Sequence, residues 1–304
     1  MINKLRKKVL VAVSGGPDSM YLLNKLNRKA LIEPVAIHVN YNFRPESKTE
    51  EQLVSKFCKR NNIHLHIFNV TDKVLENYSM FKNKQHMARE IRYDFFVKAS
   101  KLENTSIVYV GHHRDDFIET AIMQKEKSED YLFYGIEKKT VIKGLTILRP
   151  LLKLYKDQLV VELENQDINY AIDRSNFDSK FERNHIRNKL LVTPGVQKEA
   201  IFFQFQKINS SRELKRKKLN KIYLNFVKSN YSRTFFMSLT DENMKNLIFI
   251  TVSKLDMRIN LSANKIESLI AYIKAGHGSK EFILMDGITL SMSKNQIGIK
   301  NDNR

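Results

Sequence analysis

The chain lacks the residues and segments that several common classes of protein need. Cys58 is the only cysteine among 304 residues, so an intrachain disulfide, an iron–sulfur cluster and a Cys-based zinc site are all excluded. No apolar run approaches membrane-spanning length, and Val9–Val13, which follows the basic start Lys4–Lys8, is too short for the apolar core of a signal peptide. These absences predict a protein of the reducing cytoplasm without a membrane partner.

Acidic residues are also scarce. The 33 Asp and Glu residues face 52 Lys and Arg, which gives a formal net charge of +19 and a pI near 9.7. An excess of this size points to a polyanionic partner, because fixed positive charge attracts phosphate-bearing surfaces. Nucleic acid is the first candidate and an anionic membrane surface is the second.

Short apolar runs alternate with stretches of helical periodicity over the first half of the chain. The expected strands are Val9–Val13, Pro34–Tyr41, His64–Val70, Ser106–Gly111 and Thr146–Leu152. The expected helices are Ser19–Lys29, Thr49–Asn61, Lys84–Leu102, Asp115–Lys125 and 155–166. This alternation predicts an α/β fold, with a Rossmann-like parallel sheet that is covered on both faces and binds ligands beyond the carboxyl ends of its strands.

The remainder of the chain has a different pattern. A polar, Arg-rich segment runs to Pro194, and a long basic helix or helix pair is expected over Lys198–Val227. Further helices are expected over Asp241–Leu255 and Ser262–Ala275. Alternation around Asp286-Gly287 indicates a hairpin. We therefore expect an α/β domain over residues 1–197 and a smaller, mostly helical domain over 198–304 that ends in a short antiparallel sheet.

The segment after the first expected strand is unusual. It consists of Ser14, Gly15, Gly16, Pro17, Asp18 and Ser19. A glycine-rich turn between a strand and a helix aims several backbone N–H groups at one point, at the positive end of the helix dipole, and so binds phosphate. The Lys of the Walker A pattern is missing, whereas Asp18 suits a Mg²⁺ ligand beside phosphates. An ordinary strand–helix turn capped by Ser is the alternative.

The segment Ser14–Ser19 resembles the PP-loop of the N-type ATP pyrophosphatases, which hold the pyrophosphate end of ATP while an acceptor oxygen attacks the α-phosphate. Five further segments resemble, in order, those of tRNA(Ile)-lysidine synthetases: HVNYNFR (38–44), AREIRYDFF (88–96), GHHRDDFIET (111–120), RPLLKLYKDQL (149–159) and DRSNFDSKFERNHIRNKLL (173–191). The resemblance extends from about residue 9 to residue 194.

This resemblance implies a reaction in two steps. ATP adenylates the ring carbonyl oxygen of the wobble cytidine in a CAU anticodon and releases pyrophosphate. The ε-amine of free L-lysine then displaces AMP and leaves lysidine. ATP and Mg²⁺ are the implied cofactors, and tRNA(Ile) and lysine are the implied partners, whereas the oligomeric state is not indicated.

Two acidic residues stand out on the helix that is expected after the fourth strand. Asp116 and Glu119 lie three apart on one helix face, where they could ligate Mg²⁺, bind the lysine ammonium, accept a proton from the amine, or simply form a solvated face. The resemblance favours a functional role for both carboxylates, and it also implies that Arg89 and Arg92 belong to the active-site shell. The alternative for these two arginines is a pair of surface side chains that keep their charged ends in water. The catalytic candidates are Asp18, Asp116, Glu119, Arg89 and Arg92, with Asp18 and Asp116 as metal ligands. The ATP-binding candidates are Ser14, Gly15, Gly16, Pro17, Asp18, Ser19, His38, Asn40 and His112.

Basic residues supply the candidates for tRNA contact. They are Arg183, Asn184 and Arg187 in the last segment of the resemblance, and Arg212, Lys215, Arg216, Lys217 and Lys218 in the run SRELKRKKLNK. Such a run is usually a solvated helix face. With a net charge of +19 and an RNA substrate implied, we expect it to contact the RNA backbone without reading bases.

Other functions remain open at this point. A tRNA thiolase on the same fold would need catalytic cysteines. A metal-dependent phosphohydrolase would account for His112, His113, Asp115 and Asp116 but not for the PP-loop. A non-catalytic ATP- or RNA-binding module would leave the PP-loop and the acidic residues Asp116 and Glu119 without a catalytic use. The chain also departs from the family pattern. The departures are Tyr41, Asn42 and Phe43 after the second strand, Phe117 after the Asp pair, and the segment 124–136.

Overall fold

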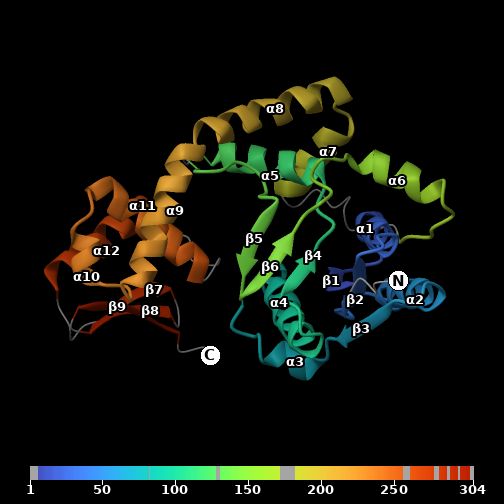
Figure 1. Ribbon diagram of the computed structural model, residues 1–304, viewed down its shortest axis with the longest axis horizontal. Coiled ribbons are helices and arrows are strands. Elements are labelled where there is room, and N and C mark those ends of the chain that lie inside the picture. Colours follow the sequence, from blue (N-terminus) through green and yellow to red (C-terminus); the bar gives the residue numbers. More distant parts are fainter. Residues whose placement is uncertain are drawn as a thin grey trace, which may run out of the picture. The chain divides into compact units, whose positions relative to one another are not determined.

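The computed structural model describes residues 6–81, 83–127, 131–171, 182–255, 261–276, 281–285, 288–293 and 295–301. The chain divides into two compact units, residues 1–209 and 210–304. Figure 1 shows a sheet with flanking helices in the first unit and helices beside a small sheet in the second. No helix in these described ranges is long and apolar enough to cross a membrane.

The first unit contains strands and helices in near-regular alternation. Its elements are β1 (Lys7–Ala12), α1 (Pro17–Asn27), β2 (Ile32–Asn40), α2 (Glu46–Arg60), β3 (His64–Asn69), α3 (Asp72–Glu76), α4 (Lys84–Leu102), β4 (Ile107–Tyr109), α5 (Arg114–Glu126), β5 (Lys139–Ile142), β6 (Leu145–Leu148), α6 (Lys156–Glu164), α7 (Glu182–Leu191) and α8 (Gly195–Ser211).

The strands form one six-stranded sheet in the order β3-β2-β1-β4-β6-β5. All neighbouring strands are parallel except β5 and β6. The prediction of a mostly parallel sheet is therefore confirmed. The chain builds outward from β1 through β2 to β3 and then crosses to β4 on the other side of β1. Ligands of open α/β sheets bind at such a switch point, beyond the carboxyl ends of the two central strands.

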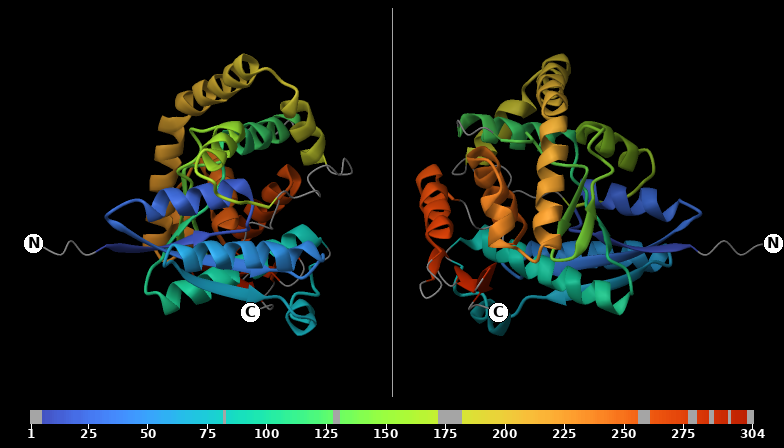
Figure 2. Two further views of the ribbon diagram at one scale, coloured as in Figure 1. Left: turned by 90° about the vertical axis from the view of Figure 1, so that its right-hand side faces the viewer. Right: turned by 60° about the vertical axis from the view of Figure 1, so that its left-hand side comes forward.

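Both faces of the sheet are covered (Figure 2). Val9 and Val11 of β1 belong to an apolar cluster that includes residues of α1, α2 and α6. Leu10 belongs to a second cluster with Phe95 and Phe96 of α4. Alternate residues of a strand point to opposite faces, so the apolar run Val9–Ala12 of β1 fits a strand segment that is buried on both sides.

Three elements of this unit were not expected: the short helix α3, the strand β5 and the helix α7. Strand β5 is a short antiparallel edge strand, joined to β6 through Lys143 and Gly144, whose φ angles of 49° and 79° suit a tight hairpin turn. Helix α7 lies in the polar, Arg-rich segment that runs to Pro194, for which the sequence predicts no helix. Its Ile186 and Leu190, four residues apart, bury one face of the helix against Phe117 and Ile118 of α5.

The division between the units lies further along the chain than the expected boundary at 197/198, which falls inside α8. Phe205 of this helix still packs in the cluster with Phe117. Asn209 exchanges hydrogen bonds with Tyr134, accepting from its backbone N–H at 2.8 Å and donating to its carbonyl at 2.9 Å. These contacts hold α8 to the first unit almost to its end.

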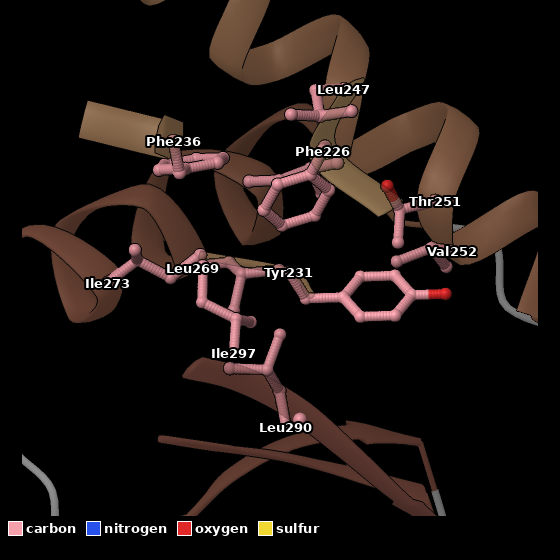
Figure 3. Close-up of a pocket in the computed structure, with 12 residues that line it drawn as sticks. Phe226, Tyr231, Phe236, Leu247, Thr251, Val252, Leu269, Ile273, Leu290 and Ile297 are labelled. Carbon is pink, nitrogen blue, oxygen red and sulfur yellow. The ribbon is translucent and has the colours of Figure 1, made fainter. Parts of the chain in front are cut away.

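The second unit is mostly helical, as expected. Its elements are α9 (Glu213–Lys228), α10 (Arg233–Met237), α11 (Asp241–Leu255), α12 (Ala263–Ala275), β7 (Phe282–Met285), β8 (Ile288–Ser293) and β9 (Gln296–Asn301). The strands form an antiparallel sheet in the order β7-β8-β9. The expected turn at Asp286-Gly287 lies outside the described residues. This unit contains an apolar cavity of about 220 Å³. Its lining residues include Phe226 and Phe236 and the strand residues Leu290 and Ile297 (Figure 3).

Candidate active site

The PP-loop segment Ser14–Ser19 connects β1 to α1. Gly15 has φ +93°, a left-handed conformation that favours glycine, and Pro17 occupies the first turn of α1, where a missing N–H costs nothing. The Ser19 hydroxyl donates to the Gly16 carbonyl at 3.0 Å and accepts from the Ser14 N–H at 3.1 Å. The serine hydroxyls thus brace the turn, and the positive end of α1 lies at this turn, shortly after the end of β1.

Gly111, which follows β4, lies directly against this loop. A Cβ atom at this position would come within 3.0 Å of the Asp18 carbonyl carbon and 3.1 Å of the Ser19 backbone nitrogen. Only glycine allows the segment after β4 to approach the start of α1 so closely. The sequence motifs that begin at Ser14 and Gly111 are therefore parts of one site.

Only one of the two carboxylate oxygens of Asp18, at the start of α1, has an ion-pair or hydrogen-bond partner among the described residues. Its Oδ1 atom is buried and has no hydrogen-bond partner among the described residues. Its Oδ2 atom lies 3.7 Å from Nε2 of His113, and the same Nε2 lies 3.4 Å from Oδ2 of Asp116. Burial raises the pKa of Asp18, and the charge of His113 opposes the rise. Two carboxylates thus converge on one imidazole.

His113 begins helix α5 and links the acidic residues. Its Nδ1 atom lies 3.2 Å from Oδ2 of Asp115. Burial would lower the pKa of His113, but the charges of Asp116 and Asp115 outweigh burial and raise it to about 9. The pKa of Asp115 is held well below its ordinary value despite burial, because His113 and the backbone N–H of Lys156, at 3.0 Å, bind its carboxylate. His113 is therefore an imidazolium at neutral pH.

Glu119, one turn further along α5, is paired with an arginine from α7. Nε of Arg187 donates to Oε1 of Glu119 at 2.8 Å, and Nη2 donates to Oε2 at 3.2 Å. The Glu119 side chain is only 2% exposed. Arg187 Nη2 also lies 3.9 Å from Oδ1 of Asp116. The sequence predicts Arg187 as a tRNA contact, whereas the structure pairs it with Glu119. The helical spacing of Ile186 and Leu190 is the signal that this segment forms a helix with one buried face.

The residues expected to bind the rest of ATP follow β2 and β4. His38 is buried, and its Nδ1 atom lies 2.8 Å from the Val13 carbonyl, so Nδ1 carries the proton. Burial lowers the pKa of His38, and its Nε2 has no partner in the part of the chain that is described. Asn40 is engaged at both ends of its amide, with Glu51 and with the backbone of Asn42. His112 directly follows Gly111.

Arg92 of α4 contacts the loop after β2, whereas Arg89 contacts Tyr93 of its own helix. Nε of Arg92 donates to the Tyr41 hydroxyl at 3.1 Å, and the Arg89 guanidinium lies 4.8 Å from the centre of the Tyr93 ring. Tyr41, one of the departures from the family pattern, thus has a role in orienting Arg92. The catalytic roles of both arginines stay predictions.

The proposed tRNA contacts fall on two helices. The side chains of Arg183 and Asn184 on α7 lie outside the described residues. On α9, Lys217 pairs with Glu213 at 2.8 Å and Lys215 pairs with Glu242 at 2.9 Å. Lys217 and Lys218 are exposed, whereas Arg212 and Arg216 are partly buried.

The donor set of the site fits a divalent cation such as Mg²⁺. Hard cations prefer carboxylate oxygens, and a buried carboxylate oxygen without a donor is costly unless something binds it. Oδ1 of Asp18 is such an atom, and the Asp116 carboxylate shares its imidazole neighbour.

Comparison with known proteins agrees with this geometry. Residues 1–193 match the PP-loop domain family. The tRNA(Ile)-lysidine synthase of Ureaplasma parvum is 35% identical, over 98% of this chain and 89% of the relative. The corresponding enzymes of Mesomycoplasma hyopneumoniae, at 36% identity over 92% of each chain, and Mycoplasmopsis pulmonis, at 35% over 95% and 98%, are equally similar.

Among solved structures, the U34-tRNA thiolase NcsA of Methanococcus maripaludis with its [4Fe-4S] cluster aligns with a TM-score of 0.53 at 19% identity, over 68% of this chain and 73% of that chain. This likeness shows a shared fold. The relatives at 35% and 36% identity, matched over nearly their whole length, show the family as well as the fold. This chain belongs to the tRNA(Ile)-lysidine synthase family.

Proposed function

We propose that this protein uses ATP to join the ε-amine of L-lysine to the wobble cytidine in the CAU anticodon of tRNA(Ile), forming lysidine. The observation that carries the proposal is the contact between Gly111 and the start of α1, which brings the PP-loop and the carboxylates of α5 into one site. The match to curated lysidine synthases over nearly the whole chain supports the choice of substrate.

In the first step, the PP-loop holds the pyrophosphate end of ATP. The N–H groups at Gly15, Gly16 and the first turn of α1 bind the phosphate oxygens. The ring carbonyl oxygen of the cytidine attacks the α-phosphorus, the bond to the bridging oxygen breaks, and pyrophosphate leaves. Neutral His38, with Nε2 as an acceptor, suits a donor group of the nucleoside.

Asp18 and Asp116 would hold Mg²⁺, which supplies charge neutralisation at the phosphates. The imidazolium of His113 keeps these two carboxylates together before ATP binds, because it lies 3.7 Å from one and 3.4 Å from the other.

In the second step, the lysine nitrogen attacks the activated ring carbon. The new C–N bond forms, the C–O bond to the adenylate breaks, and AMP leaves with that oxygen. The amine must lose protons in this step, and a carboxylate is a suitable acceptor. Both oxygens of Glu119 accept from Arg187. Glu119 therefore serves to position this guanidinium beside Asp116, where it can face the leaving phosphate.

The thiolase alternative is disfavoured by the cysteine content. Cys58 is buried in α2, and burial raises the pKa of its thiol to about 12, so the reactive thiolate is suppressed. The phosphohydrolase alternative does not account for the PP-loop.

The test is incubation of the protein with ATP, Mg²⁺, labelled lysine and a tRNA(Ile) transcript that bears CAU. Label should enter the tRNA, and a transcript with U in place of the wobble C should stay unlabelled. The variant Cys58→Ser should transfer label as the wild type does. If ATP binds but no label is transferred to active tRNA, the proposal is wrong.

A further inference from the structure

A second group of metal-binding side chains lies at the other side of the first unit, away from the PP-loop. His64 and His66 are two apart on the edge strand β3, and Glu103 directly follows helix α4. One nitrogen of each histidine and one oxygen of the glutamate lie within 4.8 Å of one another. The proposed reaction uses none of these residues.

The fold brings the three side chains together from segments distant in sequence. Residues two apart on a strand share a face, so His64, His66 and Phe68 point the same way. That face is covered by α4, since Phe95 of α4 stacks on Phe68 with ring centres 5.0 Å apart. The same helix ends at Leu102, which delivers Glu103 to the histidines.

The distances suit coordination of a metal ion. Oε1 of Glu103 lies 2.6 Å from Nε2 of His66 and 3.1 Å from Nδ1 of His64. Zinc binds histidine nitrogen at about 2.0–2.1 Å and carboxylate oxygen at about 2.0–2.2 Å, so tetrahedral ligands lie roughly 3.3–3.4 Å from one another. Small rotations of the side chains are therefore enough to admit an ion between these atoms.

The two oxygens of Glu103 have separate tasks. Oε2 accepts from Nζ of Lys8 at 2.9 Å, while Oε1 faces both imidazoles. Glu103 is buried, whereas the His64 side chain is 61% exposed. Lys8 thus fixes the carboxylate from behind, as partners of metal ligands often do, and the exposed side leaves room for a water as fourth ligand.

We propose that His64, His66 and Glu103 form a zinc-binding site. Imidazole nitrogens with one carboxylate are a ligand set that zinc favours over Mg²⁺. A bound ion would tie the edge strand β3 to the end of α4 and so stabilise the first unit. The proposal does not depend on the reaction proposed above.

The experiment titrates Zn²⁺ into the full-length protein against a chromophoric chelator, with excess Mg²⁺ present to fill sites of oxygen ligands. The double variant His64→Ala/His66→Ala should bind one equivalent less than the wild type. His86→Ala, which removes an exposed histidine from the start of α4, is the matched control and should keep that equivalent. Zn²⁺ should also raise the melting temperature of the wild type more than that of the double variant.

The single variant His64→Ala guards against misfolding, because its side chain is mostly exposed. It should weaken binding by more than the roughly 10–100-fold that loss of a ligand's supporting partner costs. Equal zinc stoichiometry and affinity in the wild type and the histidine variants would show that the three side chains form only a hydrogen-bonded cluster. Absence of tight zinc binding by the wild type would overturn the proposal equally.

Discussion

Asp18 has a buried carboxylate oxygen that no described side chain or backbone group satisfies. Such an atom costs stability in the free protein and is retained where a ligand needs it. Asp18→Asn should therefore lower pyrophosphate release by a factor of about 100 or more, as loss of a group that stabilises transition-state charge does, while the melting temperature stays equal or rises. The exposed Asp72 supplies the control Asp72→Asn. Unchanged pyrophosphate release in Asp18→Asn would remove this residue from the chemistry.

The pairing of Glu119 with Arg187 gives a prediction about stability. Arg187→Ala removes the two hydrogen bonds that this guanidinium donates to the buried Glu119 carboxylate, so the free energy of unfolding should fall by about 2–3 kcal/mol, less than for a fully buried pair because Arg187 is 26% exposed. Adding Glu119→Gln should restore part of this loss but no activity. Denaturant unfolding and lysine transfer measure the two effects. Additive losses of stability would mean that the side chains are not coupled.

His113 provides a pH dependence. Its pKa is raised from 6.5 to about 9, so its contribution to stability is fully present below pH 6.5 and is lost as the pH rises through 9. The melting temperature of the wild type should exceed that of His113→Gln at pH 6.5, and this gap should shrink toward pH 10. An exposed histidine replaced in His86→Gln is the control. A gap that is constant over this range would indicate a neutral His113.

The sequence singled out Asp18, Asp116 and Glu119, which the structure brings close together, because loop glycines, paired carboxylates and their position after strands have local signatures. It did not indicate how they pair. The contact of Arg187 with Glu119 joins residues of two helices, and only the packing of α7 on α5 brings them together. Phe117, one of the departures from the family pattern, shows the same limit: it is buried in an apolar cluster, and a Cβ on Gly135 would lie 2.5 Å from its ring.

At the scale of elements, the buried strands were predictable because a strand covered on both faces is apolar throughout. Strand β5 was not, since an edge strand with Val141 65% exposed has no such pattern. Helix α7 was missed for a related reason: only Ile186 and Leu190 mark its buried face, within a polar segment.

The contact between the β4–α5 connection and the PP-loop can be tested with one methyl group. In Gly111→Ala the new Cβ meets backbone atoms of Asp18 and Ser19 at 3.0–3.1 Å, and backbone cannot yield as a side chain can. We expect ATP affinity to fall by about 5- to 150-fold, which is the equivalent of 1–3 kcal/mol for overpacking. Gly195→Ala has no atom within 4 Å of its new Cβ and is the control. Equal ATP affinity for both variants would mean that the loop tolerates displacement.

At the scale of the whole molecule, the net charge of +19 is a property that no single motif explains. Helix α9 in the second unit buries Phe226 in the core of that unit and exposes Lys217 and Lys218. Lys217 is partly neutralised by Glu213. If the lysines of α9 bind the RNA, their removal should weaken tRNA binding more than the removal of equally exposed lysines elsewhere. If only the total charge matters, the position of the removed lysines should make no difference to tRNA binding.

The double variant Lys217→Ala/Lys218→Ala separates these two possibilities. If α9 contacts the RNA backbone, tRNA affinity should fall, and the slope of log affinity against log salt should become shallower by about 1–2, since each phosphate contact contributes about 1. Lys73→Ala/Lys101→Ala removes two exposed charges from the first unit and serves as the matched control. Filter binding of tRNA(Ile) at several salt concentrations measures both. Equal slopes for the two double variants would mean that tRNA responds to total charge, and α9 would no longer be a candidate for the interface.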